Sequence, residues 1–581
     1  MATTVQEKPR IHHHPIPPRP QPSYSETQAR ELEAELKRSI QGEVRFDNGS
    51  RALYSTDSSN YRQYPIGVVI PKHADDVVET LAIARRYGAP ITGRGGGTSL
   101  AGQCCNAAII LDFSKYMNQI IEIDTTHKTA TVQPGLILDH LNLALKKHGL
   151  IFGPDPSTHN HCTIGGMIGN NSCGVHSVMS QFYGPGARMS DNLLELEILT
   201  YDGLRMRVRA TDDHELDEII RKGGRRGEIY ENMLALRDKY ADLIRTRYPK
   251  IPRRVSGYNL DDLLPERGFN VARALTGSES TLVTVLEAKL QLIDDFPCRA
   301  LVVLGYPDVY TAGDHIPEVL THKPIGLEGI DDVLVDAMKV KGLHTAELHT
   351  LPPGGGWLIA EFGGKTSQEA DERAEAFMRA MQKVKNPPAI KLLEDPAEEK
   401  ALWEVRDSGL GASARVPGQP DTWEGWEDAA VPPDRIGPYL RDFRALLQRY
   451  GYDCTLYGHF GQGIVHTRID FGLKNRAGVE AYERFGYEAA ELVVQYGGSL
   501  SGEHGDGQSR GELLTIMFGP ELVGAFEDFK SIWDPEWKMN PGKVVRPYRR
   551  DQNLRYGDSY NPPQPETNLA TRKTMAVSLM H

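Results

Sequence analysis

Apolar residues recur along the first part of the chain in two alternating patterns. A spacing of three or four residues predicts a helix, and a short continuous apolar run predicts a strand. The patterns predict helices over 25–39, 75–87 and 137–148, and strands over 68–71, 89–92, 107–112 and 129–133. Such alternation is typical of an α/β or α+β unit of about one hundred residues.

Alternation of apolar and polar residues predicts a β-hairpin over 192–210, with its turn at Asp202 and Gly203. Residues 283–293 predict a strand or a helix that closes this domain. Many charged residues fall within 221–226 and 238–254, and they predict a solvated face rather than a binding site.

A second unit with its own strands and helices is predicted over 299–452. Its apolar patterns predict strands over 300–306 and 357–362, and helices over 369–384 and 434–450. Together with the length of 581 residues, these patterns predict two or three domains.

The composition excludes several classes of protein. A formal net charge of -12 argues against binding to nucleic acid. The six cysteines form no CxxC pair, which predicts a reducing compartment and excludes an iron–sulfur cluster held wholly within this chain. No apolar run approaches the ~20 residues of a transmembrane segment, and no signal-like leader opens the chain. We therefore expect a soluble, cytoplasmic protein.

The stretch Pro90–Gly102 is the strongest candidate for a ligand-binding loop. Its glycines leave backbone N–H groups uncovered, and the hydroxyls of Thr98 and Ser99 can donate to the same anion. Two common phosphate motifs do not fit. The loop lacks the Gly-Lys-Ser/Thr of a P-loop, and 103–110 leaves no room for the helix of a Rossmann unit.

A second region rich in small residues covers 153–174. Its glycines allow close approach to a flat ligand, and neutral hydrogen-bond donors stand at Ser157, Thr158, Asn170, Asn171 and Ser172. From the residues alone, a ligand-binding segment and a long surface loop are equally good interpretations.

Histidines and a carboxylate gather late in the chain. His459 and His466 flank a glycine-containing turn, and Glu503 and His504 follow further on. Such a set suits zinc, with positions left open for a substrate. The alternative is three hydrogen-bonded core histidines, and spacing alone favours it because the segments are far apart. Arg406, taken by itself, is best explained as a surface arginine.

The order of the motifs resembles a known family, the FAD-linked oxidases of the vanillyl-alcohol-oxidase or p-cresol-methylhydroxylase type. The segments that carry the resemblance are 92–102, 153–157, 164–166, 183–185, 277–279 and 540–543, and it covers about residues 46–546. Within the family, the chain is most similar to the FAD-dependent D-2-hydroxyacid dehydrogenases, which act on D-lactate, glycolate or D-2-hydroxyglutarate. It is also similar to the flavin half of bacterial FAD/iron–sulfur dehydrogenases.

The resemblance implies an α+β fold in which a two-part FAD-binding domain of the p-cresol-methylhydroxylase type carries an α+β cap domain over the substrate. The expected segments are a disordered arm and N-terminal helix (1–45), the FAD-binding domain (46–298), the cap domain (299–452), a segment that completes the active site and the FAD domain (453–546) and a polar, disordered tail (547–581).

The resemblance also implies which residues contact FAD. They are Arg94, Gly95, Gly96, Gly97, Thr98, Ser99, Pro156, Ser157, Gly165, Gly166, Asn170, Ser172, Glu279 and Asn540. FAD is expected to be non-covalent, because no histidine replaces Thr98 or Ser99. Arg94 would either pair with the pyrophosphate or point to solvent. Ser280 stands where the family usually has glycine, so we expect a local change of the backbone there.

The implied substrate is a small 2-hydroxyacid. Arg406 would bind its carboxylate through a planar fork of N–H groups, with Lys391 and Arg415 as weaker candidates.

The implied metal ligands are His459, His466 and Glu503, with zinc as the first choice of divalent metal. The metal would lower the pKa of the substrate hydroxyl, His504 would remove its proton, and the C2 hydride would pass to flavin N5.

Two positions depart from the family pattern and leave the substrate open. Gln462 replaces the usual aspartate and Ile464 the usual asparagine. Three alternatives share the fold: a non-redox enzyme of the alkylglycerone-phosphate synthase type, an alcohol or sugar oxidase, and a non-catalytic FAD-binding subunit. The iron–sulfur half of the fused relatives is missing from this sequence, so electrons are expected to leave to another protein, a quinone or oxygen.

Overall fold

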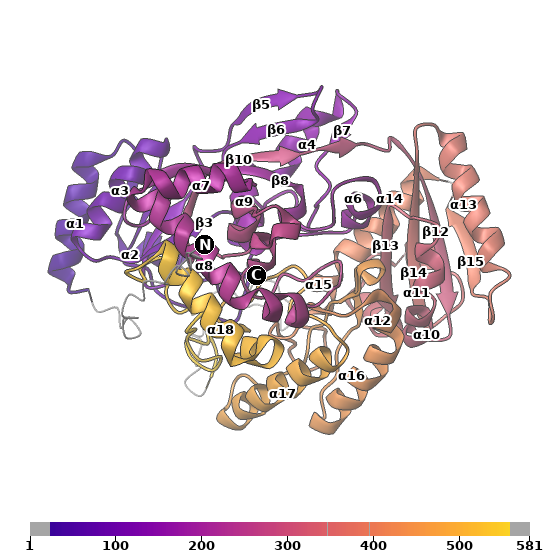
Figure 1. Cartoon of the computed structure of the whole chain (residues 1–581). Coiled ribbons are helices and arrows are strands. Elements are labelled where there is room, and N and C mark those ends of the chain that lie inside the picture. Colours follow the sequence, from indigo (N-terminus) through magenta and orange to yellow (C-terminus); the bar gives the residue numbers. More distant parts are fainter. Residues whose placement is uncertain (1–23, 346, 394, 558–581) are drawn as a thin grey trace, which may run out of the picture.

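The computed structural model describes residues 24–345, 347–393 and 395–557, so most of the predicted arm and the end of the predicted tail lie outside the described residues. Figure 1 shows the chain as a series of α+β layers, with the first sheet and its helices at one end and the cap sheet at the other. The predicted α+β class is confirmed.

The first sheet has the glycine loop at its edge strand. Its strands, in spatial order, are β1 (Glu43–Arg45), β2 (Gly67–Ile70), β4 (Ile109–Asp112) and β3 (Ile91–Arg94). β2, β4 and β3 run parallel, and helices α1 (Glu26–Ser39) and α3 (Ala74–Arg86) pack on the sheet through a shared hydrophobic cluster. The glycine loop begins at the carboxyl end of β3, which is where parallel sheets commonly bind ligands.

The second sheet is antiparallel. Its order is β5 (Ile120–Asp124), β6 (Thr129–Val132), β10 (Thr284–Gln291), β8 (Leu193–Leu199) and β9 (Arg205–Arg209). β8 and β9 are the predicted hairpin, with Gly203 in the turn at φ 95°. The closing segment at 283–293 is mainly strand β10, and β5 was not predicted.

The second glycine-containing region is not a long surface loop. Residues 164–170 form helix α5 (Ile164–Asn170), which Thr163 caps by accepting a hydrogen bond from the N–H of Gly166 at 3.2 Å. Its apolar residues Met167 and Ile168 are buried in the core. The surface-loop interpretation is wrong for 164–170, where these residues give the segment a buried face, while 153–163 contains neither a helix nor a strand.

The charged stretch after β9 forms helices α7 (Asp213–Lys222) and α8 (Gly224–Arg247), which were not predicted. α8 buries Ile229, Tyr230 and Met233 while most of its charges stay outside. The expectation of a solvated face is wrong at its end, because Arg253 and Arg254 are only 0% and 2% exposed. Both guanidinium groups have anionic partners, the buried Glu503 and the partly buried Asp261, which is what permits such burial.

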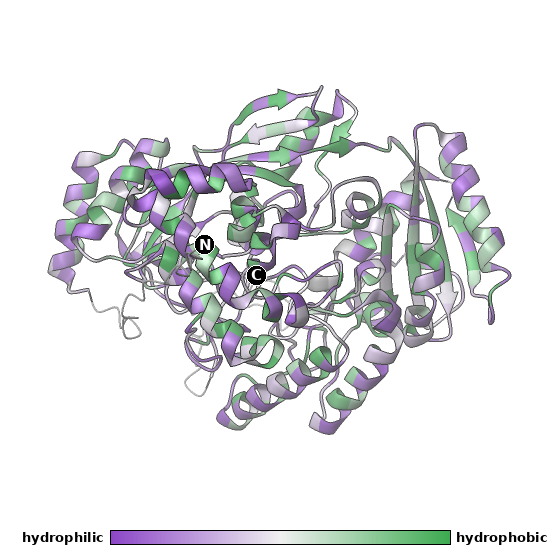
Figure 2. Ribbon diagram, in the orientation of Figure 1, coloured by the Kyte–Doolittle hydropathy of each residue, from purple (hydrophilic) through white to green (hydrophobic). Residues whose placement is uncertain are grey.

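The cap is built on a third sheet, also antiparallel. Its order is β15 (Ala389–Leu393), β12 (Cys298–Tyr306), β14 (Gly356–Gly364), β13 (Gly326–Asp331) and β17 (Tyr457–Gly458). Helix α13 (Ser367–Met381) packs on one face, and helix α14 (Pro396–Asp407) packs on the other through Leu402 and Val405. In Figure 2 these strands are largely green and α13 is largely purple.

β17 extends the cap sheet beyond the predicted boundary at residue 452. Gly329 of β13 pairs with Gly458, and Ile330 pairs with Tyr457. The segment that carries His459 is therefore joined to the cap by backbone hydrogen bonds, and the cap and the C-terminal segment share one sheet.

The C-terminal part contains α16 (Ile436–Tyr450), as predicted, and the unpredicted helices α17 (Arg476–Gln495) and α18 (Leu514–Trp533). The ordered chain also continues past the predicted boundary at 546. Arg550 is 0% exposed and its Nε donates to the carbonyl oxygen of Ser509 at 2.8 Å. Residues 547–557 thus pack on the domain, because a buried arginine fixes them there.

The remaining elements are short. They are α2 (Asn48–Leu53), α4 (Leu138–Lys146), β7 (Leu150–Ile151), α6 (Ser177–Tyr183), α9 (Val271–Leu275), β11 (Ile293–Asp294), α10 (Val309–Asp314), α11 (Ile316–Leu320), α12 (Asp332–Lys341), α15 (Gly409–Ser413), β16 (Ala429–Ala430) and β18 (Ile464–Val465).

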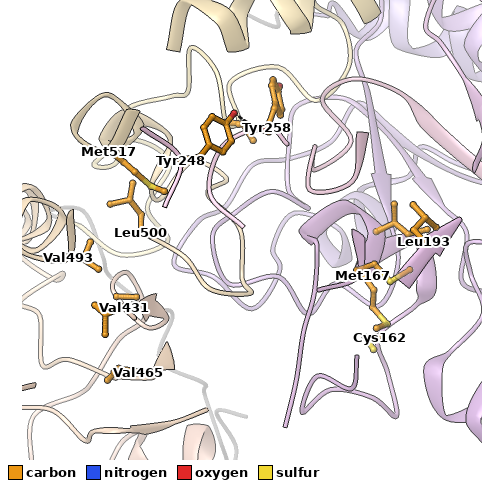
Figure 3. Close-up of a cluster of buried hydrophobic side chains, with 14 of the residues drawn as sticks. Cys162, Met167, Leu193, Tyr248, Tyr258, Val431, Val465, Val493, Leu500 and Met517 are labelled. Carbon is orange, nitrogen blue, oxygen red and sulfur yellow. Dashed lines mark hydrogen bonds between the residues drawn. The ribbon is translucent and has the colours of Figure 1, made fainter. Parts of the chain in front are cut away.

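One large hydrophobic core connects the second sheet with the cap and the C-terminal helices. Figure 3 shows parts of it, with Met167 of α5 beside Leu193 of β8, and Val431 near Val465. Within the described ranges, the structure contains no helix that combines the length and the apolarity of a membrane span.

Lys530 of α18 joins three segments in this core. Its Nζ lies 2.6 Å from Oδ2 of Asp534, 2.8 Å from the carbonyl oxygen of Met539 and 2.5 Å from that of Thr281.

We expect Lys530→Met to destabilise the protein by about 3–5 kcal/mol, because Asp534 would keep a buried charge without its partner. Urea unfolding followed by fluorescence measures this loss. The double change with Asp534→Asn should recover part of it, and an unaltered unfolding midpoint in Lys530→Met would contradict the expectation.

Candidate functional site

Two adjoining cavities run from the first sheet to the cap. They contain about 700 and about 1000 Å³ of empty space, part of it open to solvent, and share a lining of Gly95, Ser99, Cys104, Thr163, Gly166 and Asn170. The first cavity ends against Glu279 and β10, and the second ends against Arg406, Tyr457 and His504. An elongated ligand in these cavities would lie between the glycine loop and α5, with one end at the histidines.

Thirteen of the fourteen residues predicted to contact the cofactor line these cavities. The exception is Asn540, which is 0% exposed. Its Nδ2 donates to the carbonyl oxygens of Gln103 and Glu279, and its Oδ1 accepts from Thr92 and Asn106. Asn540 therefore supports the glycine loop from behind.

The glycines fit a flat ligand in two different ways. A Cβ at Gly95 would lie 2.0 Å from Oγ1 of Thr163, so this glycine lets the loop approach the start of α5. A Cβ at Gly169 would meet nothing nearer than 3.9 Å and would project into the first cavity. The lack of a side chain at Gly169 therefore leaves room for a ligand, whereas the lack of one at Gly95 leaves room for Thr163.

Arg94 lines the first cavity, and its guanidinium has partners within the protein. Its guanidinium donates to the carbonyl oxygen of Thr56 at 2.9 Å and to that of Cys104 at 3.2 Å. It also lies over the ring of Tyr54. These bonds hold the glycine loop against the segment that follows α2.

Glu279 ties the cofactor cavity to the loop that follows His504. Its carboxylate accepts from the backbone N–H groups of Asp506 at 2.6 Å and Gly507 at 2.8 Å. Ser280 has φ 61°, in the left-handed region that glycine adopts readily, so a serine here holds a conformation suited to glycine. Its Oγ accepts from the N–H of Gly93, which joins the turn to β3.

The histidine cluster surrounds one carboxylate oxygen. Oε1 of Glu503 lies 3.3 Å from Nε2 of His459 and 3.2 Å from Nε2 of His466 and of His504. Ligand atoms of His459, His466 and Glu503 all lie within 4.8 Å of one another. Two imidazole nitrogens and one carboxylate oxygen make a donor set that fits zinc, and burial keeps them together.

His504 faces two further carboxylates. Its Nδ1 lies 3.3 Å from Glu427 and 3.7 Å from Asp428, and Oδ2 of Asp428 accepts from the backbone N–H of His504 at 2.7 Å. Burial lowers the pKa of His504, but Asp428, Glu427 and Glu503 outweigh it and raise the pKa to about 10. Burial likewise opposes ionisation of Glu503, yet the histidines hold its pKa well below its usual value.

Glu427, Asp428 and His504 also form a group close enough to hold a cation. Arg510 already occupies it, because its Nη2 lies 2.7 Å from Glu427 and 2.9 Å from Asp428. The second group therefore already contains a cation, the guanidinium of Arg510, and the first group is the candidate for a metal.

Arg406 is not a surface arginine, since only 3% of it is exposed, and it lines the second cavity. Its Nε lies 2.5 Å from Oε2 of Glu328, whose Oε1 lies 2.8 Å from Nδ1 of His459. Burial raises the pKa of Glu328, but Arg406 and His459 lower it to about 2. Lys391 and Arg415 line neither cavity.

Several charged residues of the site were missed from the sequence. Arg253 donates to Glu503, to Gln462 and to the carbonyl oxygen of Gly174. Ile464, one of the two departures from the family pattern, packs against Gly502. A Cβ added at Gly502 would lie only 2.5 Å from the side chain of Ile464. Glu328, Glu427, Asp428 and Arg510 stand in no motif, and only Glu328 had a signal, a carboxylate between apolar residues of a strand.

Comparison with known proteins agrees with this geometry. Residues 65–209 match the family model of the FAD binding domain, and residues 297–544 match that of the C-terminal domain of FAD linked oxidases. The D-2-hydroxyglutarate dehydrogenase of Pseudomonas putida is 34% identical over 90% of this chain and 52% of its own length. The glycolate oxidase subunit GlcD of Bacillus subtilis is 29% identical over 87% of this chain and 95% of its own.

A solved structure of p-cresol methylhydroxylase with substrate bound has a TM-score of 0.62 at 14% identity, covering 90% of this chain and 97% of its own. At that identity the likeness shows the fold alone, and it confirms the predicted fold type. The chain spans about half the length of the first curated relatives it matches.

The buried carboxyl of Glu279 predicts a pH dependence of stability. Burial and the neighbouring Asp506 raise its pKa to about 8, against 4.5 for an ordinary glutamate. The folded state therefore favours the protonated form, so this stabilisation is present below about pH 4.5 and is lost as the pH rises through about 8.

We expect Glu279→Gln to reduce the loss of stability that occurs between pH 4.5 and about 8. The variant loses one backbone hydrogen bond, which costs about 1 kcal/mol at every pH, so the slope is the informative quantity. Thermal unfolding between pH 5 and 8.5 measures it in both proteins. Parallel curves for the wild type and the variant would contradict the assignment.

Proposed function

Because the chain belongs to the FAD linked oxidases, we propose that it oxidises a D-2-hydroxyacid to the 2-oxoacid. The observation that carries the proposal is the convergence of Arg406, His504 and the cluster around Glu503 at one end of the cavity that the glycine loop lines. A carboxylate-binding group, a proton acceptor and a metal-binding set beside a flavin would together serve this reaction.

The cofactor would be held by the residues that line the two cavities. The glycine loop offers its backbone N–H groups and hydroxyls to a diphosphate, and α5 offers a flat surface without side chains at Gly166 and Gly169. Bound there, FAD supplies an acceptor for two electrons. It would be non-covalent, since Thr98 and Ser99 stand in the loop where a histidine would be needed.

Arg406 would bind the substrate carboxylate. Its guanidinium is buried, and Glu328 fixes its Nε, so the group reaches the cavity in one orientation. A planar fork that holds a carboxylate through two bonds decides which face of C2 meets the cofactor. Selection of the D-enantiomer would follow from that orientation.

His504 would take the hydroxyl proton at Nε2. Its Nδ1 faces Glu427 and Asp428, which hold the N–H on that nitrogen and leave Nε2 as the acceptor. A divalent metal, zinc foremost, would be held by His459, His466 and Glu503 and would supply Lewis acidity to the substrate oxygens. A cation on Glu503 would remove one of the three carboxylates that raise the pKa of His504, and so would favour the neutral form that a base needs.

The substrate within this class and the electron acceptor are further parts of the proposal. The relatives' names point to D-2-hydroxyglutarate and glycolate as the first substrates to test. Electrons would pass from the reduced flavin to a separate acceptor. A soluble, cytoplasmic location stays a prediction.

The direct test is anaerobic. The purified protein should be yellow, or take up added FAD, and a D-2-hydroxyacid should bleach the flavin absorbance. Treatment with a chelator should slow bleaching, and added zinc should restore it. A colourless protein that binds no FAD would overturn the proposal, and an FAD-loaded protein that no 2-hydroxyacid bleaches would favour the non-redox, the alcohol- or sugar-oxidising or the non-catalytic alternative.

Kinetic measurements can distinguish the proposed roles of His504 and Arg406. His504→Ala should slow flavin reduction by at least about 100-fold, the usual contribution of a general base, while FAD remains bound. Arg406→Lys keeps the charge but loses the fork, so it should raise KM more than it lowers kcat. Stopped-flow reduction rates over a range of substrate concentrations distinguish the two patterns. Wild-type reduction in His504→Ala would remove this residue as the base.

A further inference from the structure

Glu328 occupies a position that neither motif nor resemblance identifies. It stands on β13, between β14 and the edge strand β17 of the cap sheet, it is 0% exposed, and its two oxygens have different partners. Oε2 accepts from Nε of Arg406 at 2.5 Å, and Oε1 lies 2.8 Å from Nδ1 of His459. One carboxylate thus contacts both the proposed substrate-binding arginine and a proposed metal ligand.

Position 328 requires a side chain with two hydrogen-bond acceptors, one for Arg406 and one for His459. Nε of Arg406 is always a donor, because a guanidinium carries no acceptor. His459 can offer Nε2 as a metal ligand only if its hydrogen sits on Nδ1, which then needs an acceptor as well. A carboxylate is the side chain that provides two acceptor oxygens side by side, and glutamine provides only one.

The surroundings of Nδ1 strengthen this requirement. Nη2 of Arg406 also lies 3.2 Å from Nδ1 of His459. Without Glu328, that N–H group would donate to Nδ1, and the imidazole hydrogen would move to Nε2. The shorter contact to the Glu328 carboxylate decides the tautomer in the other direction.

The backbone fixes this carboxylate against its partners. Gly329, the next residue, pairs with Gly458 of β17, and an added Cβ at Gly329 would lie 2.1 Å from the ring of Phe460. His459 lies between Gly458 and Phe460, so both of its chain neighbours are in contact with β13. Glu328 and His459 consequently face each other across a rigid sheet edge.

We propose that Glu328 is a positioning residue that sets the tautomer of His459 for metal binding and, through the same carboxylate, the orientation of Arg406. The proposal rests on the proposed function, because it assumes that His459 binds a metal through Nε2. It adds that one residue links metal affinity to substrate recognition.

The test is the zinc affinity of the FAD-loaded protein after removal of metal, measured by competition with a chromogenic chelator. Glu328→Gln should weaken zinc binding about 10–100-fold, the usual effect of removing a partner that orients a metal-binding histidine. Flavin absorbance and bound FAD should stay as in the wild type. Glu328→Asp keeps both acceptors on a shorter side chain and should lose less affinity than Glu328→Gln, so it serves as well if the glutamine variant does not fold.

Glu361 supplies a matched control. It is also buried, it lies on the same face of the same sheet as Glu328, and its Oε1 accepts from Nε1 of Trp403, one turn before Arg406 on α14. Its other partners are His176 and Arg299 rather than a histidine of the cluster. Glu361→Gln should therefore lower stability and leave zinc affinity unchanged.

The outcomes separate the two proposals. Equal zinc affinity in the wild type and Glu328→Gln would overturn the role of Glu328 while leaving the metal site intact. Equal losses in Glu328→Gln and Glu361→Gln would also overturn it, since the effect would then be a general one of the cap. A wild type that binds no zinc would overturn both the metal site and this role.

Discussion

The buried carboxylate of Glu503 is the constraint around which the site is arranged. Its Oε1 faces the Nε2 atoms of three histidines, and its Oε2 faces the guanidinium of Arg253. A carboxylate removed from water is stable only when positive or donating groups surround it. The chain therefore has to bring together the segment after α8, the turn around β17 and β18, and the loop after Ser501, which are far apart in sequence.

Further buried ion pairs surround Glu503 and balance the charges next to it. Glu328 compensates Arg406, and Glu427 and Asp428 together compensate Arg510. Asp428 also accepts from the backbone N–H groups of residues 502–504, so the same carboxylate that balances a charge shapes the loop that carries Glu503. Each ion pair thus has a geometric role as well as an electrostatic one, and the removal of one partner would leave a buried charge alone.

The sequence predicts the layers of the fold better than the ion pairs. Regular apolar spacing locates α1, α3, β8, β9, β12 and β14 to within a few residues, because their buried faces repeat with a fixed period. α5 escapes prediction since glycines interrupt its apolar residues, and α8 because charges outnumber them. The glycine loop is visible because many glycines gather within a few residues, whereas the late histidines became site candidates through the family resemblance, since their spacing alone favours core histidines. Glu328 and Arg253 have no such signal, since their roles depend on partners that only the tertiary fold brings near.

The neutral residue at position 462 has a physical consequence for this balance. The family pattern places an aspartate there, whereas here Oε1 of Gln462 accepts from Nε of Arg253, and its Nε2 donates to Gln181 at 2.7 Å. An amide satisfies the hydrogen bond but carries no charge, so Glu503 is the one carboxylate that hydrogen-bonds Arg253 among the described residues. Arg253 and a metal would then both bind the carboxylate of Glu503, Arg253 through Oε2 and the metal through Oε1. The charge at position 462 therefore bears on how strongly Glu503 can hold a cation, although position 462 contributes no ligand to the cluster.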